Sequence, residues 1–440
     1  MEAMTLAESA PRQIAQQSWS PLRRIAFRFC VVYFGLYRLV SQIINSVLVI
    51  PKVDVPDWGA VLPIRLGVFW VAAHFFHKKT PLVYSGSGSG DKVYDWVLVF
   101  CALVVSVMAA AVWSALDRKR GSYPALYKWF RVFLRFCLGG QMLMYGFVKA
   151  FPLQMPYPPL SRLVERFGDM SPMGVLWWSV GAAPGWETFA GCAELVGGLL
   201  LMFPRTTTLG ALIALADMTQ VFVLNMTYDV PVKQFSFHLI LISLLLLALE
   251  MRRLADFFLF NRTAAPSERA PLFEGQRARR IADGVIAFLW IWMLGNNLYN
   301  VLDGWRQFGP GREKSALYGI WNIEDETLDG KPVPLLVTDA QTWRQMIFDF
   351  PQYTEVERMG DSRGFGTAID AKTAMVTLTD RADKKWQARL HYTRPAFDRL
   401  TLEGTAGGHA ATLHLVRVDE KKLLLESRGF HWVQDYPFNR

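Results

Sequence analysis

The sequence predicts a polytopic bundle of membrane helices followed by a soluble all-β domain. Hydrophobic residues make up 52% of the 440 residues and charged residues only 19%, whereas an average soluble chain carries about 25% charged residues. Long apolar segments fill the chain up to residue 307, and short β-rich segments follow residue 312. This composition excludes disordered, collagen-like and disulfide-scaffold classes.

Short basic runs flank the long apolar segments and carry much of the net charge of +9. The positive-inside bias produces such runs on the cytoplasmic side of a membrane protein, so we expect topology signals and no nucleic-acid partner. The runs are Arg23-Arg24, Arg118-Lys119-Arg120 and Arg277, Arg279 and Arg280.

The four cysteines predict neither disulfides nor a metal site. They lie inside apolar segments, and no pair has C-x-x-C spacing. Zinc sites and disulfide frameworks show regular spacings outside such segments, so we expect no metal. The cysteines are Cys30, Cys101, Cys137 and Cys192.

Seven apolar segments have about the 20 residues that a membrane-spanning helix needs. The charge rule then places the chain in a bacterial inner membrane, with a cytoplasmic N-terminus and a periplasmic C-terminal domain. A shorter segment, 60–76, is expected to be re-entrant or interfacial; if it spans, the N-terminus flips and Arg23-Arg24 violate the rule. The expected spans are 26–50, 93–115, 129–151, 184–203, 207–227, 235–251 and 281–303.

The loop 152–172 contains five prolines and leads into Trp177-Trp178. Tryptophan is enriched at the headgroup level of a membrane. We therefore expect Ser171–Val180 to form an amphipathic helix on the outer surface of the membrane.

After the linker Phe308–Arg312 the sequence reads as short strands, which predict a small β-barrel or a sandwich. The expected strands are Ala374–Thr379, Gln387–Tyr392, Ala411–Val418 and Leu423–Ser427.

The opening Gly319-Ile-Trp321 is similar to the G-x-W start of lipocalin-like barrels. That resemblance implies that Arg428 covers Trp321 from the last strand. A closed barrel that holds no ligand is the alternative.

These signals divide the chain into six parts. They are a cytoplasmic N-terminal segment 1–24, an N-terminal transmembrane region 25–128, a four-helix transmembrane core 129–251, a cytoplasmic loop 252–280, a last transmembrane helix 281–307 and an exoplasmic β-domain 312–440.

Polar residues inside the expected spans are the candidate site. An ionisable side chain at the centre of a span costs about 2.5–3.5 kcal/mol and marks a functional site by default. Pairing Lys149 with Glu194, or Asp217 with His238, would reduce that cost. The alternative is that these charged pairs only hold the helices together and have no further role. The expected ligand-binding residues are Lys149, Glu187, Glu194, Asp217, Asn225 and His238, and the expected catalytic residues among them are Lys149, Glu194 and Asp217.

Three runs between residues 145 and 247 resemble the DoxX-like family of four-helix membrane proteins. They are Tyr145-Gly-Phe-Val-Lys149, then Phe189-Ala-Gly-Cys-Ala-Glu194-Leu-Val-Gly-Gly-Leu-Leu-Leu-Met202, and Arg205-Thr-Thr-Thr-Leu-Gly210-Ala-Leu. The resemblance implies a membrane subunit of an oxidoreductase system linked to quinones or to thiol and sulfur metabolism. It also makes Lys149, Glu194 and Arg205 the motif positions.

Two classes of function follow from these expectations. In the first, the polar residues line an outward-facing pocket for a lipophilic ligand such as a quinone, where Glu194 or Asp217 relays a proton and Lys149 binds a negatively developing oxygen. In the second, the chain is a non-enzymatic scaffold subunit whose β-domain docks a periplasmic or membrane protein partner. Whether the chain is an enzyme stays open.

Overall fold

A computed structural model of the chain describes all but six short parts of it. Most of the expected N-terminal segment 1–24 and residues 42–50 of the expected span 26–50 lie outside the described residues. The parts that are not described are residues 1–17, 42–56, 249, 266–270, 337 and 440.

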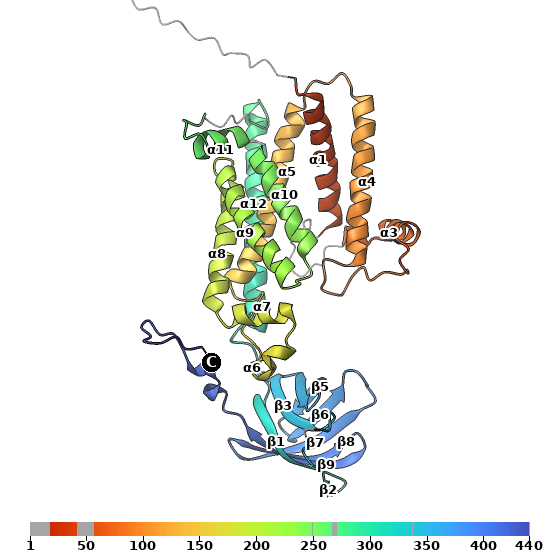
Figure 1. Ribbon diagram of the computed structural model, residues 1–440, viewed down its shortest axis with the longest axis vertical. Helices are drawn as coiled ribbons and strands as arrows, with labels where there is room; N and C mark the ends of the chain where they lie inside the picture. Colours follow the sequence, from red (N-terminus) through yellow and green to blue (C-terminus); the bar gives the residue numbers. More distant parts are fainter. Residues whose placement is uncertain (1–17, 42–56, 249, 266–270, 337, 440) are drawn as a thin grey trace, which may run out of the picture. The chain divides into compact units, whose positions relative to one another are not determined.

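The first part of the described chain is helical (Figure 1). The longer helices are α1 (Pro21–Val40), α3 (Leu62–His74), α4 (Val93–Leu116), α5 (Pro124–Ala150), α7 (Pro172–Gly181), α8 (Pro184–Met202), α9 (Thr207–Thr227), α10 (Lys233–Ala248), α11 (Met251–Phe258) and α12 (Gln276–Phe308). Shorter turns are η1 (Trp58–Ala60), α6 (Leu160–Val164) and η2 (Phe167–Asp169).

Three described helices are long and apolar enough to cross a membrane: α4, α9 and α12. A fourth span results if α10 and α11, bent by 80° at their break, are counted as one. Only 28% of the apolar window of each of the three helices is buried inside the protein. The structure therefore supports candidate membrane helices, but length and composition do not support the expected count of seven.

The helices that fall short of this test either carry charges or are too short. Helix α5 has 27 residues and includes Lys128, Arg131, Arg135 and Lys149. Helix α3 has 13 residues, which extend about 20 Å, too short for a hydrocarbon core of about 30 Å. Figure 1 shows α3 nearly end-on while α4 is seen from the side, so the two helices cross steeply.

The expected helix at Ser171–Val180 is confirmed as α7. Ser171 accepts a hydrogen bond from the Gly174 backbone N–H at 3.1 Å, which is the N-cap arrangement that starts a helix. Trp177 and Trp178 both lie on this helix.

The C-terminal strands form a closed antiparallel barrel. Within the described residues the sheet runs in the order β2-β1-β3-β4-β5-β6-β7-β8-β9, and β1 also pairs with β9. This pairing removes the exposed sheet edges and confirms the barrel over the sandwich. The strands are β1 (Gly319–Leu328), β2 (Lys331–Pro332), β3 (Trp343–Phe350), β4 (Tyr353–Arg358), β5 (Ser362–Asp370), β6 (Met375–Asp380), β7 (Gln387–Ala396), β8 (Arg399–Ala406) and β9 (His409–Arg417).

Side chains fill the interior of the barrel. Alternate residues point inward along each strand, and an eight-stranded barrel is just wide enough for side chains to fill it. Among the fully or almost fully buried residues are Trp321, Phe348, Phe365, Leu378, Leu390, Leu402 and Leu413.

One expected strand and one expected contact are wrong. Leu423–Ser427 is no strand: its last four residues form a short helix, α13 (Leu424–Ser427). The chain has left the barrel at this point, so Arg428 lies over Phe438 at 4.7 Å. The cation near the ring of Trp321 is instead Arg394, at 5.5 Å.

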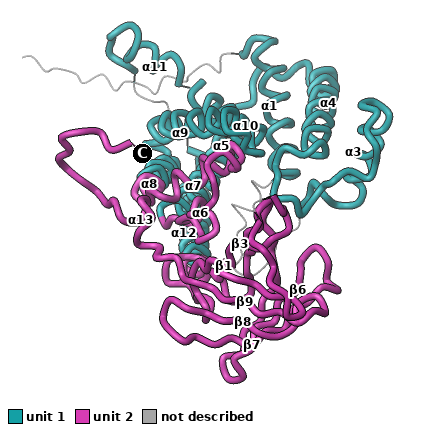
Figure 2. The backbone as a smooth tube through the Cα atoms, turned by 60° about the horizontal axis from the view of Figure 1, so that its bottom comes forward, with its two compact units in different colours: residues 1–150, 189–301 teal, residues 151–188, 302–440 magenta. Residues whose placement is uncertain are grey.

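The chain divides into two compact units (Figure 2). Unit 1 contains residues 1–150 and 189–301, and unit 2 contains residues 151–188 and 302–440. The proline-rich loop with α6 and α7 therefore belongs with the barrel. In unit 2, Asp349 of β3 accepts a hydrogen bond from the Leu160 backbone N–H at 3.1 Å and forms an ion pair with Arg312.

Candidate functional site

Two glycines bring helices α5 and α8 into close contact within unit 1. A Cβ atom at Gly191 would lie 2.2 Å from the backbone nitrogen of Ala150, and one at Gly146 would lie 2.8 Å from that of Leu195. Such distances leave no room for a side chain, and small residues are the usual means of close packing between membrane helices.

Lys149 and Glu194 lie three residues after these glycines, each on its own helix, and form a buried ion pair. Lys149 is 8% and Glu194 2% exposed. The expected pairing of these two residues is confirmed. A pair of this kind repays the desolvation of both charges only when its geometry is good, and the glycine contact fixes that geometry.

Asp217 joins this pair from a third helix. It is the middle residue of the 21-residue helix α9, and its carboxylate interacts electrostatically with both Glu194 and Lys149. One oxygen of each acid, Oε2 of Glu194 and Oδ2 of Asp217, is buried and has no hydrogen-bond partner among the described residues. Lys149, Glu194 and Asp217, here called the charged triad, thus combine one ammonium group with two carboxyl groups.

His238 is not part of the triad, so its expected pairing with Asp217 is wrong. Its Nε2 lies 2.8 Å from the Tyr33 hydroxyl, and its Nδ1 lies 2.7 Å from the Gln234 carbonyl oxygen. The ring also stacks on Tyr37 at 3.8 Å between centroids. These partners occupy both ring nitrogens and place His238 between α1 and α10.

Glu187 and Asn225 form hydrogen bonds outside the triad: Glu187 to the backbone of a loop, and Asn225 to a side chain at the start of α10. Glu187, in unit 2, accepts hydrogen bonds from the backbone N–H groups of Gln154 at 3.1 Å and Met155 at 2.9 Å. Asn225 donates to the Ser236 hydroxyl at 3.0 Å and so joins the end of α9 to the start of α10. The structure thus brings three of the six expected site residues together in the triad, whereas Glu187, Asn225 and His238 lie outside it.

A separate pocket of about 820 Å³ lies between α1, α5 and α12 in unit 1. None of the six expected site residues lines it. It is lined by Gly35, Arg38, Leu39, Trp129, Val132, Phe133, Phe136, Phe273, Ala278, Ile281, Ala282, Val285, Ile286 and Leu289.

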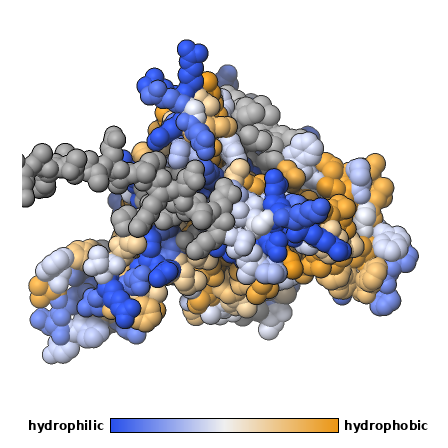
Figure 3. Space-filling view, turned by 90° about the horizontal axis from the view of Figure 1, so that it is seen from above, coloured by the Kyte–Doolittle hydropathy of each residue, from blue (hydrophilic) through white to orange (hydrophobic). Residues whose placement is uncertain are grey.

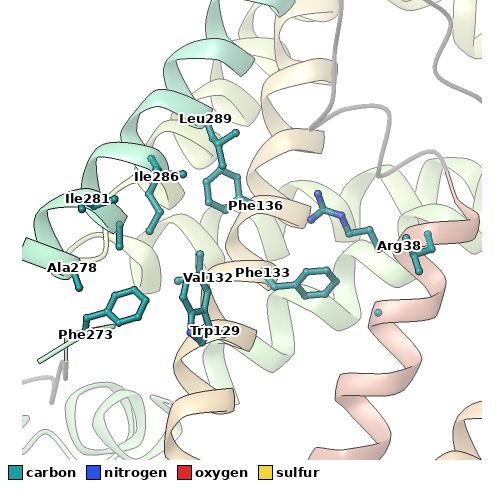
Figure 4. A pocket seen from close by; sticks show the side chains of 14 residues that line it. Arg38, Trp129, Val132, Phe133, Phe136, Phe273, Ala278, Ile281, Ile286 and Leu289 are labelled. Carbon is teal, nitrogen blue, oxygen red and sulfur yellow. The ribbon is translucent and has the colours of Figure 1, made fainter. Parts of the chain in front are cut away.

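Arg38 is the one charged residue among the 14 that line this pocket. Figure 4 shows its side chain reaching from α1 toward Phe133 and Phe136 of α5, with Ile286 and Leu289 of α12 on the far side. Its Nη1 donates to Cys137 Sγ at 3.1 Å, and its guanidinium lies 5.2 Å from the Phe133 ring centroid.

Sequence reasoning had one signal for this pocket, the position of Arg38. Arg28 lies on the same helix but has hydrogen-bond partners outside the pocket: it donates to the Tyr123 hydroxyl at 2.8 Å and to Ser114 Oγ at 2.8 Å. Arg38 lies deeper in the expected first span, where snorkelling to the interface explains it poorly. The rest of the lining is apolar and has no distinguishing pattern in the sequence.

Comparison with known proteins gives one distant relative. An uncharacterized protein of Bacillus subtilis (strain 168), YwoB, is 27% identical over 148 residues, which are 32% of this chain and 84% of that protein. No family model matches the chain. No solved structure matches it either.

Proposed function

We propose that this chain is an integral membrane protein that binds a lipophilic molecule with a hydrogen-bond-accepting head group, such as a quinone, in the pocket between α1, α5 and α12. The observation that carries the proposal is the lining itself: an apolar pocket of about 820 Å³ with a single guanidinium. Ligand sites typically have volumes of about 300–1,000 Å³, mostly apolar walls and a few placed polar groups.

The outer surface of the helices supports a bilayer environment. Figure 3 shows apolar residues gathered on the flanks of the helical part. Soluble proteins rarely expose contiguous apolar patches of this kind. On α4 alone, the exposed residues include Leu103, Val104, Val105, Val107, Met108 and Val112.

The proposed topology has seven spans, a cytoplasmic N-terminus and a periplasmic barrel in a bacterial inner membrane. Helices α1, α5 and α8, with 20, 27 and 19 residues, supply the additional length. Their buried charges have partners inside the protein, which lowers the cost of placing them in lipid. The basic runs of the connecting loops support the orientation.

Arg38 supplies the specificity of the proposed site. A guanidinium carries five N–H donors in a planar fork and accepts nothing, so it selects a carbonyl, carboxylate or phosphate oxygen. A quinone offers a carbonyl oxygen attached to a flat apolar body, which the aromatic rings of Phe133 and Phe136 can contact. Together with the resemblance to DoxX-like proteins, this supports a role as the quinone-binding component of an oxidoreductase system.

The test is to measure the lipophile that co-purifies with the full chain in mild detergent. Absorption spectra and mass spectrometry of extracted lipids should reveal about one lipophile per chain. Replacing Arg38 by Leu removes a charged hydrogen bond worth about 1.5–3 kcal/mol, so occupancy should fall about 10- to 100-fold. Val285→Trp, which fills the pocket, should have a similar effect.

A matched control separates pocket binding from general effects on the helices. Val112 is 58% and Val285 53% exposed, but Val112 on α4 does not line the pocket. Val112→Trp should therefore retain the lipophile. Equal retention in all variants, or no lipophile in the wild type, would refute the proposed function.

A second candidate function is the scaffold role, favoured by the C-terminal tail of the chain. Four large residues of this tail are each at least 79% exposed: Phe430, Trp432, Val433 and Tyr436. Because side chains fill the interior of the barrel, the barrel would recognise a partner through its outer surface. Removing residues 429–440 should then release a co-purifying protein partner without changing the bound lipophile.

A further inference from the structure

We propose that the charged triad is a proton-binding site in which its two carboxyl groups hold one exchangeable proton between them. This inference is independent of the proposed function, because no residue of the triad lines the pocket. It rests on the placement of the three groups and on the balance of their charges.

The three groups come from three different helices that pack together. Lys149 and Glu194 form an ion pair across the glycine contact of α5 and α8. Asp217 on α9 interacts electrostatically with both of them. Close contacts also join α8 to α9, since a Cβ atom at Gly210 would lie 2.9 Å from the backbone nitrogen of Leu201.

The charges of the triad do not cancel when all three groups are ionised. One ammonium and two carboxylates leave one negative charge in excess, at the middle of a candidate membrane span. An uncompensated charge in such a place costs several kcal/mol. Binding one proton makes the triad neutral, and this is the smallest change that does so.

Asp217 is the residue that holds the proton. Glu194 already has the ammonium group of Lys149 as its direct partner, whereas no hydrogen bond to the carboxylate of Asp217 is found among the described residues. An ionised carboxylate can only accept hydrogen bonds, but its protonated form can also donate one. The buried Glu194 Oε2, which has no partner in the described part of the chain, is an acceptor of the kind such a donor needs.

The protein does not enclose the triad on all sides. Glu194 is 2% exposed, but Asp217 is only half-buried. The ionisable groups facing Asp217 from the neighbouring helices are Lys149 of α5 and Glu194 of α8. On α10, His238 is bonded to Tyr33 and Gln234, and its ring is not among the groups that act electrostatically on Asp217.

The proposal predicts how many protonated carboxyl groups each variant contains. Infrared spectroscopy of the full chain in lipid nanodiscs at neutral pH detects them through the carbonyl stretch of the un-ionised acid. The wild type should show one such group, which is lost when the pH is raised. Asp217→Asn should show none. Glu194→Gln should also show none, because one carboxylate and one ammonium are then balanced.

Lys149→Met gives the opposite result. Without the ammonium group both carboxyl groups must be neutral, so the carbonyl signal should double. The matched control is Asp229→Asn, two residues after the C-terminal end of the same helix as Asp217, where an exposed carboxylate pairs with Lys233 at 2.8 Å. This variant should keep the wild-type signal. Size-exclusion profiles and melting curves identify any variant that fails to fold. The remaining variants still test the predicted number of protonated carboxyl groups.

Two results would overturn the proposal. The first is an infrared spectrum that disagrees with the predicted number of protonated carboxyl groups: none in the wild type at neutral pH, or a carbonyl signal that persists in Asp217→Asn. The second is loss of the wild-type signal at constant pH when sodium chloride replaces choline chloride, because the site would then bind a metal cation in place of a proton.

Discussion

Gly146 of α5 and Gly191 of α8 face each other so closely that a Cβ atom at Gly191 would lie 2.8 Å from the Gly146 carbonyl oxygen. Real Cβ contacts are essentially never this short. The contact is with backbone atoms, which cannot swing away as a flexible side chain does. Both glycines precede members of the charged triad by three residues, so helix packing and the position of the triad are coupled.

The first prediction is that Gly191→Ala destabilises the helical bundle. The added methyl group forces α5 and α8 apart, and overpacking of this kind typically costs about 1–3 kcal/mol. Thermal unfolding in detergent measures the loss. Gly295→Ala is the control, since a Cβ atom there has no neighbour within 4 Å. Equal melting temperatures for the two variants would contradict the close contact.

The second prediction concerns Asp349, which joins both the proline-rich loop and Arg312 to strand β3 in unit 2. Asp349 is 5% exposed, pairs with Arg312 and accepts from the Leu160 backbone N–H at 3.1 Å. Asp349→Ala leaves the Arg312 guanidinium, whose side chain is 14% exposed, without its carboxylate partner, and breaking a buried pair in this way typically costs about 3–5 kcal/mol. Urea unfolding of the full chain, followed by the near-ultraviolet circular dichroism of the barrel tryptophans, should show this loss.

A surface ion pair provides the control for this prediction. Glu324 and Arg399 pair across the barrel with 47% and 49% of their side chains exposed. Because exposed pairs contribute only about 0–1 kcal/mol, Glu324→Ala should change stability little. A larger effect for Glu324→Ala than for Asp349→Ala would show that the contacts of Asp349 are not what stabilises this part of unit 2.

The third prediction is a loss of barrel stability in acid that depends on Asp380. Burial raises the pKa of this carboxyl, but the backbone N–H groups of Ala382 and Asp383 and the Arg363 guanidinium outweigh burial and hold the pKa below its usual range. An unfolded aspartate has a pKa of about 3.9. The stabilisation is therefore complete above about pH 3.9 and is lost as the pH falls through the lower folded pKa.

Comparing the wild type with Asp380→Asn tests this pH dependence. When the pH is lowered from about 6 to about 3, the melting temperature of the wild type should decrease more than that of the variant. The variant should be the less stable of the two at the higher pH, because an amide forms weaker hydrogen bonds with Arg363. Parallel curves for both proteins would assign the acid sensitivity to other carboxyl groups.

The barrel could be predicted from the sequence because its signals are local. Strands with alternating burial, such as Val376, Leu378 and Asp380 of β6, show the period of two directly in the residue order. The segment 423–427 has β-rich composition but follows the strand that already closes the barrel. Both edges of β9 are already paired, with β1 and with β8, and the segment forms a helical turn instead.

The site was predicted only where the sequence spacing carried information about space. Lys149 and Glu194 were recognised as charges in apolar segments, and their pairing followed from neighbouring helices. The pocket depends on how α1 packs beside α5 and α12, which are far apart in the sequence. Its aromatic and aliphatic lining looks the same in the sequence as a helix face that contacts lipid, and the charge of Arg38 within an apolar segment is the one feature of the lining that stands out in the sequence.

The last prediction separates His238 from the charged triad. Tyr33→Phe removes the hydroxyl bonded to Nε2 of a histidine that is 4% exposed, and an unsatisfied buried polar group typically costs about 1–3 kcal/mol. Thermal unfolding should show this loss, whereas Tyr299→Phe at an exposed position of α12 should be neutral. The infrared signal of the protonated carboxyl group should stay at one per chain in Tyr33→Phe, because the ring of His238 supplies no charge to Asp217. A change in that signal would place His238 inside the proton-binding site, and the charge balance of the triad would then need a fourth member.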